Sequence, residues 1–411
     1  MHIKEIPNHI FDEYALKHPL GSFHQSSNYA LLMAEQDFDY DCIGMYDDFG
    51  NILAASLILH KKVSMFSHYG YAPKGFLVDY YNKPLLEKFT TLIKEYYGKK
   101  GFAFIKINPE IAVGEVNFKQ KYQIDYNQNR LVSTYLENLG YKKFKKTADF
   151  NTKLPRYNAI LPLKTFDIKN TSKNTRNKIR NGMRKGLVFE RGNRESINIL
   201  YDFIKNKKTR ELLYYKDIFN VFDRSNMVDV FLVKVHYQDY LTNIKYMYEY
   251  ELEKNSELNE KLTKNPSTTN INLKMQSDKN LNAYHDNMIE ASKGLQNKKE
   301  VYIAGAITIR YKDRVNILIS GFDKSASHFN ANYFLHYMIF NYYKDDFDFI
   351  DLNGISGNFD HTNKYRGLNR FKLNWNPKVF EFIGEYDLVI NENAYMNLTN
   401  SKKLSNEFDI K

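Results

Sequence analysis

The residues best suited to chemistry lie at positions 349–387, where an apolar strand pattern leads into a glycine loop and then into a group of cations. Gly354 and Gly357 allow the backbone to turn and to approach a ligand closely. The cations that follow are Arg366, Arg370 and Lys372. Fixed positive charge beside such a loop indicates a site that binds or stabilises negative charge. Taken alone, the segment is also typical of a solvated surface loop.

Four further motifs lie upstream in the chain. They are GSFHQSSNYA at 21–30, a strand pattern at 51–59 after an Asp-x-x-Gly turn, YGYAPKGFLVD at 69–79 and FIKINPE at 104–110. The C-terminal segment adds an aspartate within a strand, an aromatic-Lys pair and a closing Ile-Gly-Glu: Asp351, Phe371–Lys372 and residues 383–385. In this order the motifs resemble the FemABX family, the non-ribosomal peptidyl transferases that build the cross-bridge of bacterial peptidoglycan.

The resemblance implies a fold and an activity. It implies tandem acetyltransferase-like (GNAT) domains and, in the FemA-type branch, an inserted coiled-coil arm. It also implies an aminoacyltransferase of cell wall biogenesis, and hence of cell shape. Such an enzyme moves an amino acid from aminoacyl-tRNA to the side-chain amine of the stem peptide in a peptidoglycan precursor of the lipid II type.

The resemblance also assigns the catalytic roles. Attack of the amine on the ester carbonyl creates an oxyanion, and Lys372 matches the lysine that stabilises it in related enzymes. Arg366 and Arg370 would hold phosphate of either substrate. Where relatives often have Asp-Pro, this chain has Asn108, which cannot act as a base. The general base is therefore left open between Glu110, Asp79 and proton transfer by the substrate itself.

The same motifs predict the substrate-binding residues. These are Gln25, Tyr71, Lys74, Gly75, Asp79, Asn108, Glu110, Arg210, Tyr215, Asn353, Gly354, Gly357, Tyr365 and Phe371. The chain departs from the family pattern at Leu31 and Leu32, near the position of an acceptor-binding lysine. Arg210, upstream of Tyr214–Tyr215, matches a family basic residue with a register that could slip by one.

Positive charge is concentrated at residues 164–194. This segment contains ten basic and two acidic residues, which gives it a net charge of +8 within a total of +11. Residues 172–185 predict a helix with Ser172 as its N-cap and a cationic face. The expected tRNA-binding residues are Lys173, Arg176, Lys178, Arg180, Arg184 and Lys185. A smaller basic cluster lies at 142–146. A solvated charged helix and a surface for anionic lipid headgroups are the alternatives.

Strand and helix patterns alternate on both sides of this basic segment, which favours an α/β (α+β) fold. Residues 1–150 predict a first GNAT-like domain, and residues 151–240 with 300–390 a second one. The predicted strands are 42–46, 52–60, 102–108, 228–236, 301–311, 314–321 and one beginning at 349. The predicted helices are 25–35, 84–97, 129–139, 196–207, 216–223 and 331–344. Residues 391–411 form a tail.

Residues 241–299 are polar and carry a heptad pattern, which predicts an antiparallel coiled-coil hairpin with a turn near 265–270. The seam is formed by Leu281, Tyr284, Met288, Ala291 and Leu295. The strands on either side, ending near 236 and beginning at 301, should be neighbours in one sheet. A disordered insertion is the alternative.

Composition predicts a cytoplasmic globular enzyme, with 43% apolar residues, no signal peptide pattern and apolar runs too short to cross a bilayer. Cys42 alone cannot form a disulfide framework, and the scattered histidines imply no metal site and no cofactor. Expected partners are aminoacyl-tRNA, a lipid-linked or UDP-linked muramyl peptide, the cytoplasmic leaflet of the membrane, and related transferases or a second copy.

Two other classes stay open. An acyl-CoA N-acetyltransferase of the same fold would carry a pyrophosphate loop at a helix start, and no such segment is visible. A non-catalytic tRNA- or precursor-binding homologue would lack Lys372 and the loops, which are present. The sequence identifies neither the amino acid transferred nor its position in the bridge.

Overall fold

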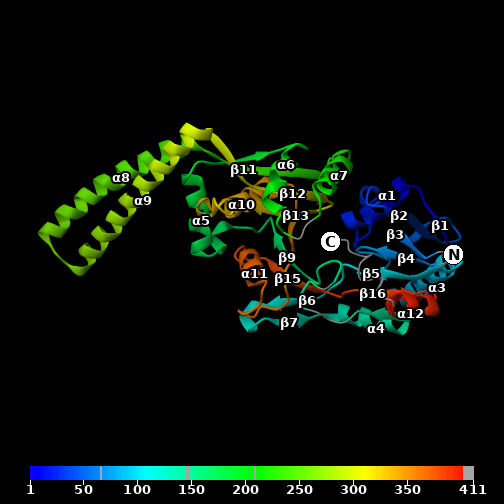
Figure 1. The fold of residues 1–411 in the computed structure, drawn as a ribbon. Helices are drawn as coiled ribbons and strands as arrows, with labels where there is room; N and C mark the ends of the chain where they lie inside the picture. The colour runs from blue at the N-terminus through cyan, green and yellow to red at the C-terminus, as the bar shows by residue number, and fades with distance from the viewer. Residues whose placement is uncertain (65–66, 145–147, 151, 208–209, 401–411) are drawn as a thin grey trace.

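The computed structural model describes residues 1–64, 67–144, 148–150, 152–207 and 210–400. The chain forms two β-sheets with helices packed on both faces, and a long helical arm projects from one end (Figure 1). The mixed α/β class predicted from the sequence is confirmed. The described part of the chain has no helix with the length and apolar character needed to cross a bilayer.

Sheet 1 has seven strands in the order β1-β2-β3-β4-β5-β16-β8. They are β1 (His2–Glu5), β2 (Asp39–Tyr46), β3 (Ile52–Ser64), β4 (Ser67–Ala72), β5 (Phe102–Ile107), β16 (Tyr386–Val389) and β8 (Tyr141–Lys143). Neighbouring strands are antiparallel except β4 and β5, which are parallel.

Sheet 2 has nine strands in the order β10-β11-β12-β13-β14-β9-β15-β6-β7. They are β10 (Leu187–Arg191), β11 (Val228–His236), β12 (Glu300–Tyr311), β13 (Arg314–Phe322), β14 (Phe349–Gly354), β9 (Tyr157–Pro162), β15 (Lys378–Phe382), β6 (Ala112–Asn117) and β7 (Gln123–Tyr126). Here β13 and β14 are the parallel pair.

The two sheets repeat one topology. In each sheet the first four strands are antiparallel to their neighbours, and the fifth strand pairs parallel with the fourth. The sixth strand then pairs antiparallel with the fifth, and the seventh antiparallel with the sixth. This repeat agrees with the tandem GNAT-like arrangement that the resemblance implies. The two sheets do not divide the chain at residue 150. Strands β6 and β7 precede residue 150 but belong to sheet 2, and β16 follows it but belongs to sheet 1. The domain limits given above stay a prediction.

The helices at 8–17, 366–373 and 392–400 were not predicted from the sequence, and the other described helices lie at or near predicted segments. They are α1 (Asn8–Lys17), α2 (Ser27–Ala34), α3 (Lys83–Lys99), α4 (Leu131–Asn138), α5 (Lys173–Arg184), α6 (Ser196–Ile204), α7 (Leu212–Asp223), α8 (Tyr237–Lys264), α9 (Thr268–Lys298), α10 (Ala331–Tyr343), α11 (Arg366–Leu373) and α12 (Glu392–Asn400). Short 3₁₀ turns include η1 (Phe23–Gln25), η4 (Ile168–Asn170) and η5 (Ser327–Phe329). Ser172 caps α5 as expected, since its hydroxyl accepts from the Thr175 amide at 3.1 Å.

A shared core joins the sheets. Because successive side chains of a strand point to opposite faces, Val228, Val230 and Leu232 of β11 enter the core between the sheets, together with α1, α2, α6 and α7. Phe231 and Val233 enter a second core with α10 and the base of the arm. A third core lies on the outer face of sheet 1, under α3 and α4.

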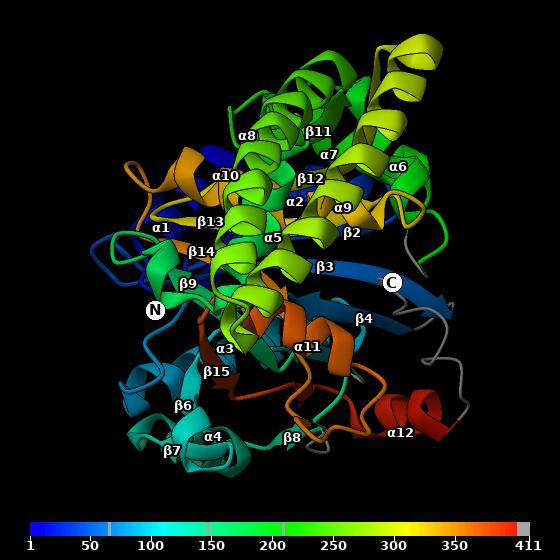
Figure 2. The ribbon, with the colours of Figure 1, turned by 90° about the vertical axis from the view of Figure 1, so that its left-hand side faces the viewer.

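The arm is an antiparallel hairpin of α8 and α9, and it begins four residues before the predicted start. It is inserted between β11 and β12, which are paired up to His236 and Glu300, so the predicted neighbourhood of these strands is confirmed. The arm projects on the side of α5 and α10, away from α3 and α12 (Figures 1 and 2). Its coiled-coil character stays a prediction.

Candidate active site

Two cavities meet where the parallel strands of sheet 2 separate. The pairing of β13 with β14 ends at Asn316 and Asp351, although both strands continue. A cavity of about 280 Å³ is lined by Asn316 and Asp351, and a second one of about 430 Å³ by the next residues along each strand, Ile317 and Leu352. This alternation shows that the cavities open on opposite faces of the sheet. Both are lined by Leu318, Ile319 and Asn353 at the gap.

The smaller cavity, here the carboxylate cavity, lies between the N-terminal half and sheet 2. Its wall comes from η1 and α2, from the ends of β4 and β5, from α7 and from the strands at the gap. The polar and charged side chains that line it include Ser22, His24, Lys74, Glu110, Lys153, Asn158, Arg210, Asp351 and Asn353. It thus combines groups from segments far apart in the sequence.

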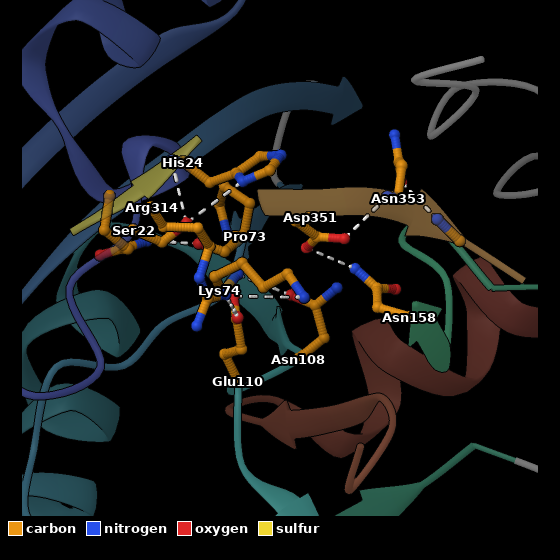
Figure 3. Close-up of polar contacts among 12 residues, drawn as sticks. Ser22, His24, Pro73, Lys74, Asn108, Glu110, Asn158, Arg314, Asp351 and Asn353 are labelled. Atoms are coloured by element: carbon orange, nitrogen blue, oxygen red, sulfur yellow. Dashed lines mark hydrogen bonds and ion pairs between the residues drawn. The ribbon is translucent and has the colours of Figure 1, made fainter. Parts of the chain in front are cut away.

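Glu110 is held by two cations, Lys74 of this cavity and Arg314 of β13 (Figure 3). Its carboxylate forms an ion pair with Arg314 of β13 and lies 3.5 Å from the ammonium of Lys74. Burial raises the pKa of Glu110, but Lys74 and Arg314 outweigh it and hold the pKa at about 2. Glu110 is therefore a permanent anion that joins sheet 1 to sheet 2.

Asp351 is the other carboxylate in the cavity. It accepts hydrogen bonds from Asn158 Nδ2 at 2.9 Å and from the Asn353 amide at 2.7 Å (Figure 3). Burial raises the pKa of Asp351, although Arg314 lowers it. Within the described residues, Asn158 Oδ1 and Arg210 Nη2 are buried without a hydrogen-bond partner. Such atoms are costly to leave unpaired, and a polar ligand in the cavity can satisfy them.

The larger cavity, here the lysine cavity, contains Lys372. This residue lies on α11 and its ammonium donates to the Gly354 carbonyl at the end of β14. Burial lowers the pKa of Lys372 to about 8, although the nearby Asp351 raises it. Lys207 also lines the cavity, with its ammonium 3.0 Å from the Ser320 carbonyl. The result is a cationic pocket in which Lys372 is buried and Lys207 is exposed.

Aromatic packing fixes the position of Lys372. Phe371 lines the lysine cavity, and its ring contacts Tyr333, His336 and Trp375, with centroids 5.2, 4.8 and 6.3 Å away. His336 Nδ1 donates to the Asn332 carbonyl at 2.8 Å, and burial lowers the His336 pKa to about 4. His336 is therefore neutral at physiological pH. The ring contacts of Phe371 therefore also fix the position of the neighbouring Lys372.

The two glycines of the loop serve protein packing. A Cβ on Gly354 would lie 2.3 Å from Pro155, and one on Gly357 would lie 2.4 Å from the Tyr157 ring. The close approach expected to a ligand is thus made by the protein's own side chains. Asn353, at φ +68°, takes the left-handed conformation that turns β14 into the loop.

The matching gap in sheet 1 is closed. Asn108 follows β5 and accepts from the Lys74 amide at 2.7 Å, while its Nδ2 donates to Tyr71 at 3.1 Å. The Gln25 amide donates to the Pro73 carbonyl at 2.8 Å and accepts from a main-chain amide, and a Cβ on Gly75 would lie 2.9 Å from this side chain. These residues hold the turn that presents Lys74. Direct contact of Gln25, Tyr71, Gly75 and Asn108 with substrate stays a prediction.

Five other predicted residues, Gly357 among them, lie outside the two cavities as the described residues line them. Arg366 and Arg370 are exposed on α11, and the Arg366 guanidinium donates to the His361 carbonyl at 3.1 Å. Asp79 is exposed and accepts from the Tyr81 amide, whereas Tyr365 packs edge-on against Phe150. Arg210 and Tyr215, by contrast, both line the carboxylate cavity.

The basic helix α5 packs on α10, which also supplies Asn332 and His336 to the lysine cavity. A Cβ on Gly182 of α5 would lie 3.2 Å from the Phe334 Cβ of α10. Helix α10 thus lies between α5 and the cavity that contains Lys372. Figure 2 shows α5 between the base of the arm and α11.

The six basic residues predicted to bind tRNA, five in α5 and Lys185 at its C-cap, differ in their surroundings. The Arg176 guanidinium donates to the Lys169 and Thr171 carbonyls, Lys178 lies 4.3 Å from the centre of the Tyr333 ring, and Lys185 is buried. The cations that are exposed are Lys173, Arg180 and Arg184. In the 142–146 cluster Lys142 pairs with Glu392 at 2.7 Å, and residues 145 and 146 lie outside the described residues.

Several groups of the site were not among the residues predicted from the sequence. Arg314, Asn158 and His24 enter the carboxylate cavity or its ion pairs, and Lys207 and His336 line the lysine cavity. His24 lies inside the motif at 21–30, which could have pointed to it, whereas the other four lie in segments without a motif, so only the tertiary contacts reveal those. Asp351 was visible as the strand aspartate of the C-terminal motif, without an assigned role.

Comparisons with known proteins agree with this architecture. A model of the FemAB family matches residues 6–403. The chain is similar to the lipid II:glycine glycyltransferase of Staphylococcus epidermidis (strain ATCC 35984), with 24% identity over 403 residues that cover 95% of this chain and 93% of the relative. It is 23% identical to the lipid II:glycine glycyltransferase of Staphylococcus haemolyticus (strain JCSC1435) over 414 residues, with the same coverage.

A solved structure shows the same fold. The crystal structure of FemX aligns with a TM-score of 0.76 and 21% identity, over 97% of this chain and 100% of that chain. At this level of identity the alignment supports a conclusion about the fold alone.

Proposed function

The chain belongs to the FemAB family, and from this premise we propose that it is an aminoacyltransferase of peptidoglycan synthesis. Its donor is an aminoacyl-tRNA, and its acceptor is the stem-peptide side-chain amine of a lipid II-type precursor. The product is a lengthened interpeptide bridge. Two of the relatives described above are named for the transfer of glycine to lipid II, so glycine is the first amino acid to test.

The observation that carries the proposal is the gap between β13 and β14, where a carboxylate-lined cavity and a lysine-lined cavity meet. Peptide-bond formation brings together an amine, which must lose protons, and an ester carbonyl, which gains negative charge. Carboxylates on one side of the gap and a buried cation on the other match these two needs. Holding both substrates in line supplies a large share of the rate enhancement.

In this proposal the acceptor occupies the carboxylate cavity. Its stem-peptide amine points toward Asp351 and Asn353 at the gap. Arg210 and Lys74 lie on the wall of the same cavity and suit the phosphate groups of a lipid-linked or UDP-linked muramyl peptide. Arg210 has a buried N–H group without a partner in the described residues, as expected for a group that awaits a ligand oxygen.

The donor ester occupies the lysine cavity. Lys372 then lies where it can stabilise the oxyanion, because its ammonium is already positioned by the Gly354 carbonyl and by the packing of Phe371. The exposed cations of α5, one helix away, contact phosphates of the tRNA. Arg366 and Arg370, exposed on α11, would extend this contact rather than touch the ester.

The place of action follows from the acceptor. A lipid-linked precursor lies in the cytoplasmic leaflet, so we place the protein in the cytoplasm with peripheral contact to that leaflet. The net charge of +11 favours a surface of anionic lipids. Association with a second copy or with related transferases belongs to the same proposal, since successive additions share one growing bridge.

The test is a transfer assay with the full chain. Total tRNA charged with labelled amino acids is offered with lipid-linked or UDP-linked muramyl pentapeptide, and the product is identified by mass. We expect a mass increase of one amino acid residue on the stem peptide, first with glycine. Uncharged tRNA and acetyl-CoA serve as control donors. A product formed from acetyl-CoA alone, or none from any charged tRNA with either acceptor, would overturn the proposal.

A further inference from the structure

The carboxylate cavity has two carboxylates among the described residues that line it, Glu110 and Asp351. Their surroundings differ in charge. Glu110 is paired with Arg314 and lies close to Lys74, which hold its pKa at about 2, although burial acts in the opposite direction. Asp351 receives its hydrogen bonds from the neutral groups of Asn158 and Asn353, and burial raises its pKa. Two carboxylates with opposed environments in one site have different roles.

The groups that face Asp351 come from several elements. Arg314 of β13 and Glu110 after β5 interact with its charge, and Asp351 in turn acts on Lys372 of α11. The wider cavity adds His24, Lys74, Lys153 and Arg210, together with three tyrosines. Burial raises the pKa of Asp351 and makes it a better proton acceptor than an exposed aspartate, while Arg314 favours its carboxylate form.

Resting on the proposed function, we propose that Asp351 is the general base that deprotonates the attacking amine. It lies on β14 at the point where pairing with β13 ends, so its carboxylate borders the gap from the acceptor side. Lys372 borders the gap from the donor side. The base on β14 and the oxyanion cation on α11 therefore flank the position of the new peptide bond from opposite sides of the gap.

The protons and electrons balance as follows. The acceptor enters as an ammonium ion and gives one proton to the Asp351 carboxylate. The nitrogen lone pair then forms the C–N bond while the carbonyl π electrons move to the oxygen, next to Lys372. On collapse the ester C–O bond breaks, and the second nitrogen proton passes to the leaving ribose oxygen. Asp351 finally releases its proton to solvent.

Other groups near the gap are less suited to accept this proton. Asn108, at the position where relatives often carry an aspartate, accepts from the Lys74 amide through its side-chain oxygen and cannot take a proton at neutral pH. Asp79 is exposed and does not line the carboxylate cavity. Glu110 is bound in its ion pairs. Asp351 lies at the gap, and no ion pair holds its carboxylate as two ion pairs hold that of Glu110 among the described residues.

The test is the pH dependence of single-turnover transfer by Asp351→Asn with saturating charged tRNA and UDP-linked muramyl pentapeptide. We expect a rate at least about 100-fold below wild type, the usual range for a lost general base, with the KM values of both substrates changed by less than about threefold. The wild-type rate falls as pH drops and Asp351 takes up a proton. This acid limb should vanish in Asp351→Asn.

Glu110→Gln is the matched control, and it should retain the acid limb whatever its rate. Asp351→Ala provides a second measurement, because formate can occupy the space left by the carboxylate and should restore transfer in proportion to its concentration. Formate should have no such effect on Glu110→Ala. Circular dichroism and binding of the acceptor show whether each variant is folded.

The outcomes separate the two proposals. Active wild-type protein together with an Asp351→Asn variant of near-normal rate and unchanged acid limb would overturn the assignment of Asp351 and leave the proposed function standing. Absence of rescue by formate in a folded Asp351→Ala variant would do the same. A wild-type protein that transfers no amino acid would overturn both.

Discussion

At the scale of single residues, the site depends on how burial and ion pairing act on a few charged groups. Lys372 is buried beside the Gly354 carbonyl, and burial lowers its pKa to about 8, although Asp351 raises it. Near neutral pH it is still mostly charged, yet it lies in a medium where its field is weakly screened. A cation of this kind is suited to the stabilisation of an oxyanion that exists only in the transition state.

Lys372→Met should therefore lower single-turnover transfer by about 100-fold or more while both substrates still bind. The cation is the protonated form, so its contribution is present below a pH of about 8 and is lost as the pH rises beyond it. The wild-type rate should show this alkaline limb, and the variant should lack it. Rates at pH 6–10, with acceptor binding measured by calorimetry, check both points.

Arg370→Met is the control for Lys372→Met, since Arg370 is an exposed cation two residues away on the same helix. It should keep the alkaline limb. Near-normal turnover of a folded Lys372→Met variant would remove Lys372 from the chemistry.

At the scale of elements, α5 and the arm form one side of the molecule. The Lys185 ammonium lies 5.6 Å from the centre of the Tyr240 ring at the base of the arm, and Tyr240 in turn donates to Asn287 at 2.9 Å. His328 of η5 contacts Glu290 at 2.6 Å. The basic helix and the arm are thus held in a fixed relation close to the lysine cavity.

Replacement of the exposed cations of α5 should weaken binding of tRNA. The variant is Lys173→Gln, Arg180→Gln and Arg184→Gln together; Arg176 is left in place because it caps the preceding loop. The slope of log affinity against log salt should become shallower by up to about three, because up to three phosphate contacts are lost. Filter binding of tRNA at several salt concentrations measures this.

The control carries the same change of charge on the other side of the molecule, at the exposed Lys62, Lys88 and Lys99. Its salt slope should match wild type. If instead the α5 variant keeps its slope for tRNA but loses binding to vesicles of anionic lipid, the helix serves the membrane.

The arm has a base that is buried in the core of sheet 2 and a distal part that lies outside that core. Tyr240, Ile244 and Ala291 are buried in the same core as sheet 2. Removing residues 248–284 and closing the gap with a Gly/Ser turn should change the free energy of unfolding by less than about 1 kcal/mol, because a short turn is easily closed. Removing 237–299 should cost about 4 kcal/mol, since these buried side chains are lost. Chemical denaturation measures both.

We expect the distal truncation to lose affinity for tRNA or for a related transferase while its fold is retained. Full activity and unchanged binding would show that the distal arm is dispensable. Aggregation of the 248–284 deletion would show that the distal part, too, belongs to the folded core.

At the scale of the whole molecule, one topology is used twice for different purposes. In sheet 1 the parallel strands β4 and β5 stay paired as far as Ala72 and Ile107, and Asn108 fills the space beyond them. In sheet 2 the parallel strands part, and the two cavities meet between them. The first copy thus forms a wall of the site, whereas the second copy contains the gap itself.

A bulky residue in the gap should separate the two substrates. Leu318 lines both cavities, so Leu318→Trp should lower transfer on the order of 100-fold while tRNA and acceptor each bind within about threefold of wild type. Leu131→Trp, at an exposed position on α4, is the control and should transfer normally. Normal transfer by Leu318→Trp would show that the reaction does not cross this gap.

The sequence by itself determined the features that depend on local pattern. Seven of the sixteen described strands and most of the described helices follow the apolar periodicity, Ser172 caps α5, and the polar heptad pattern that starts near 241 indicates the arm. The aromatic-Lys pair at Phe371–Lys372 was also visible, because the resemblance rests on contiguous residues. Each of these features depends only on residues that are close together in the sequence.

Tertiary structure decided which of the candidate residues meet. Arg314 and Glu110 form an ion pair across more than two hundred positions, and Asn158 reaches Asp351 from another strand of sheet 2. Arg366 and Lys372 are both cations of one short segment, yet Arg366 is exposed whereas Lys372 is buried, and burial lowers the pKa of Lys372 to about 8, with Asp351 raising it. Burial and long-range pairing set charge and pKa, and both arise only when the two sheets pack together.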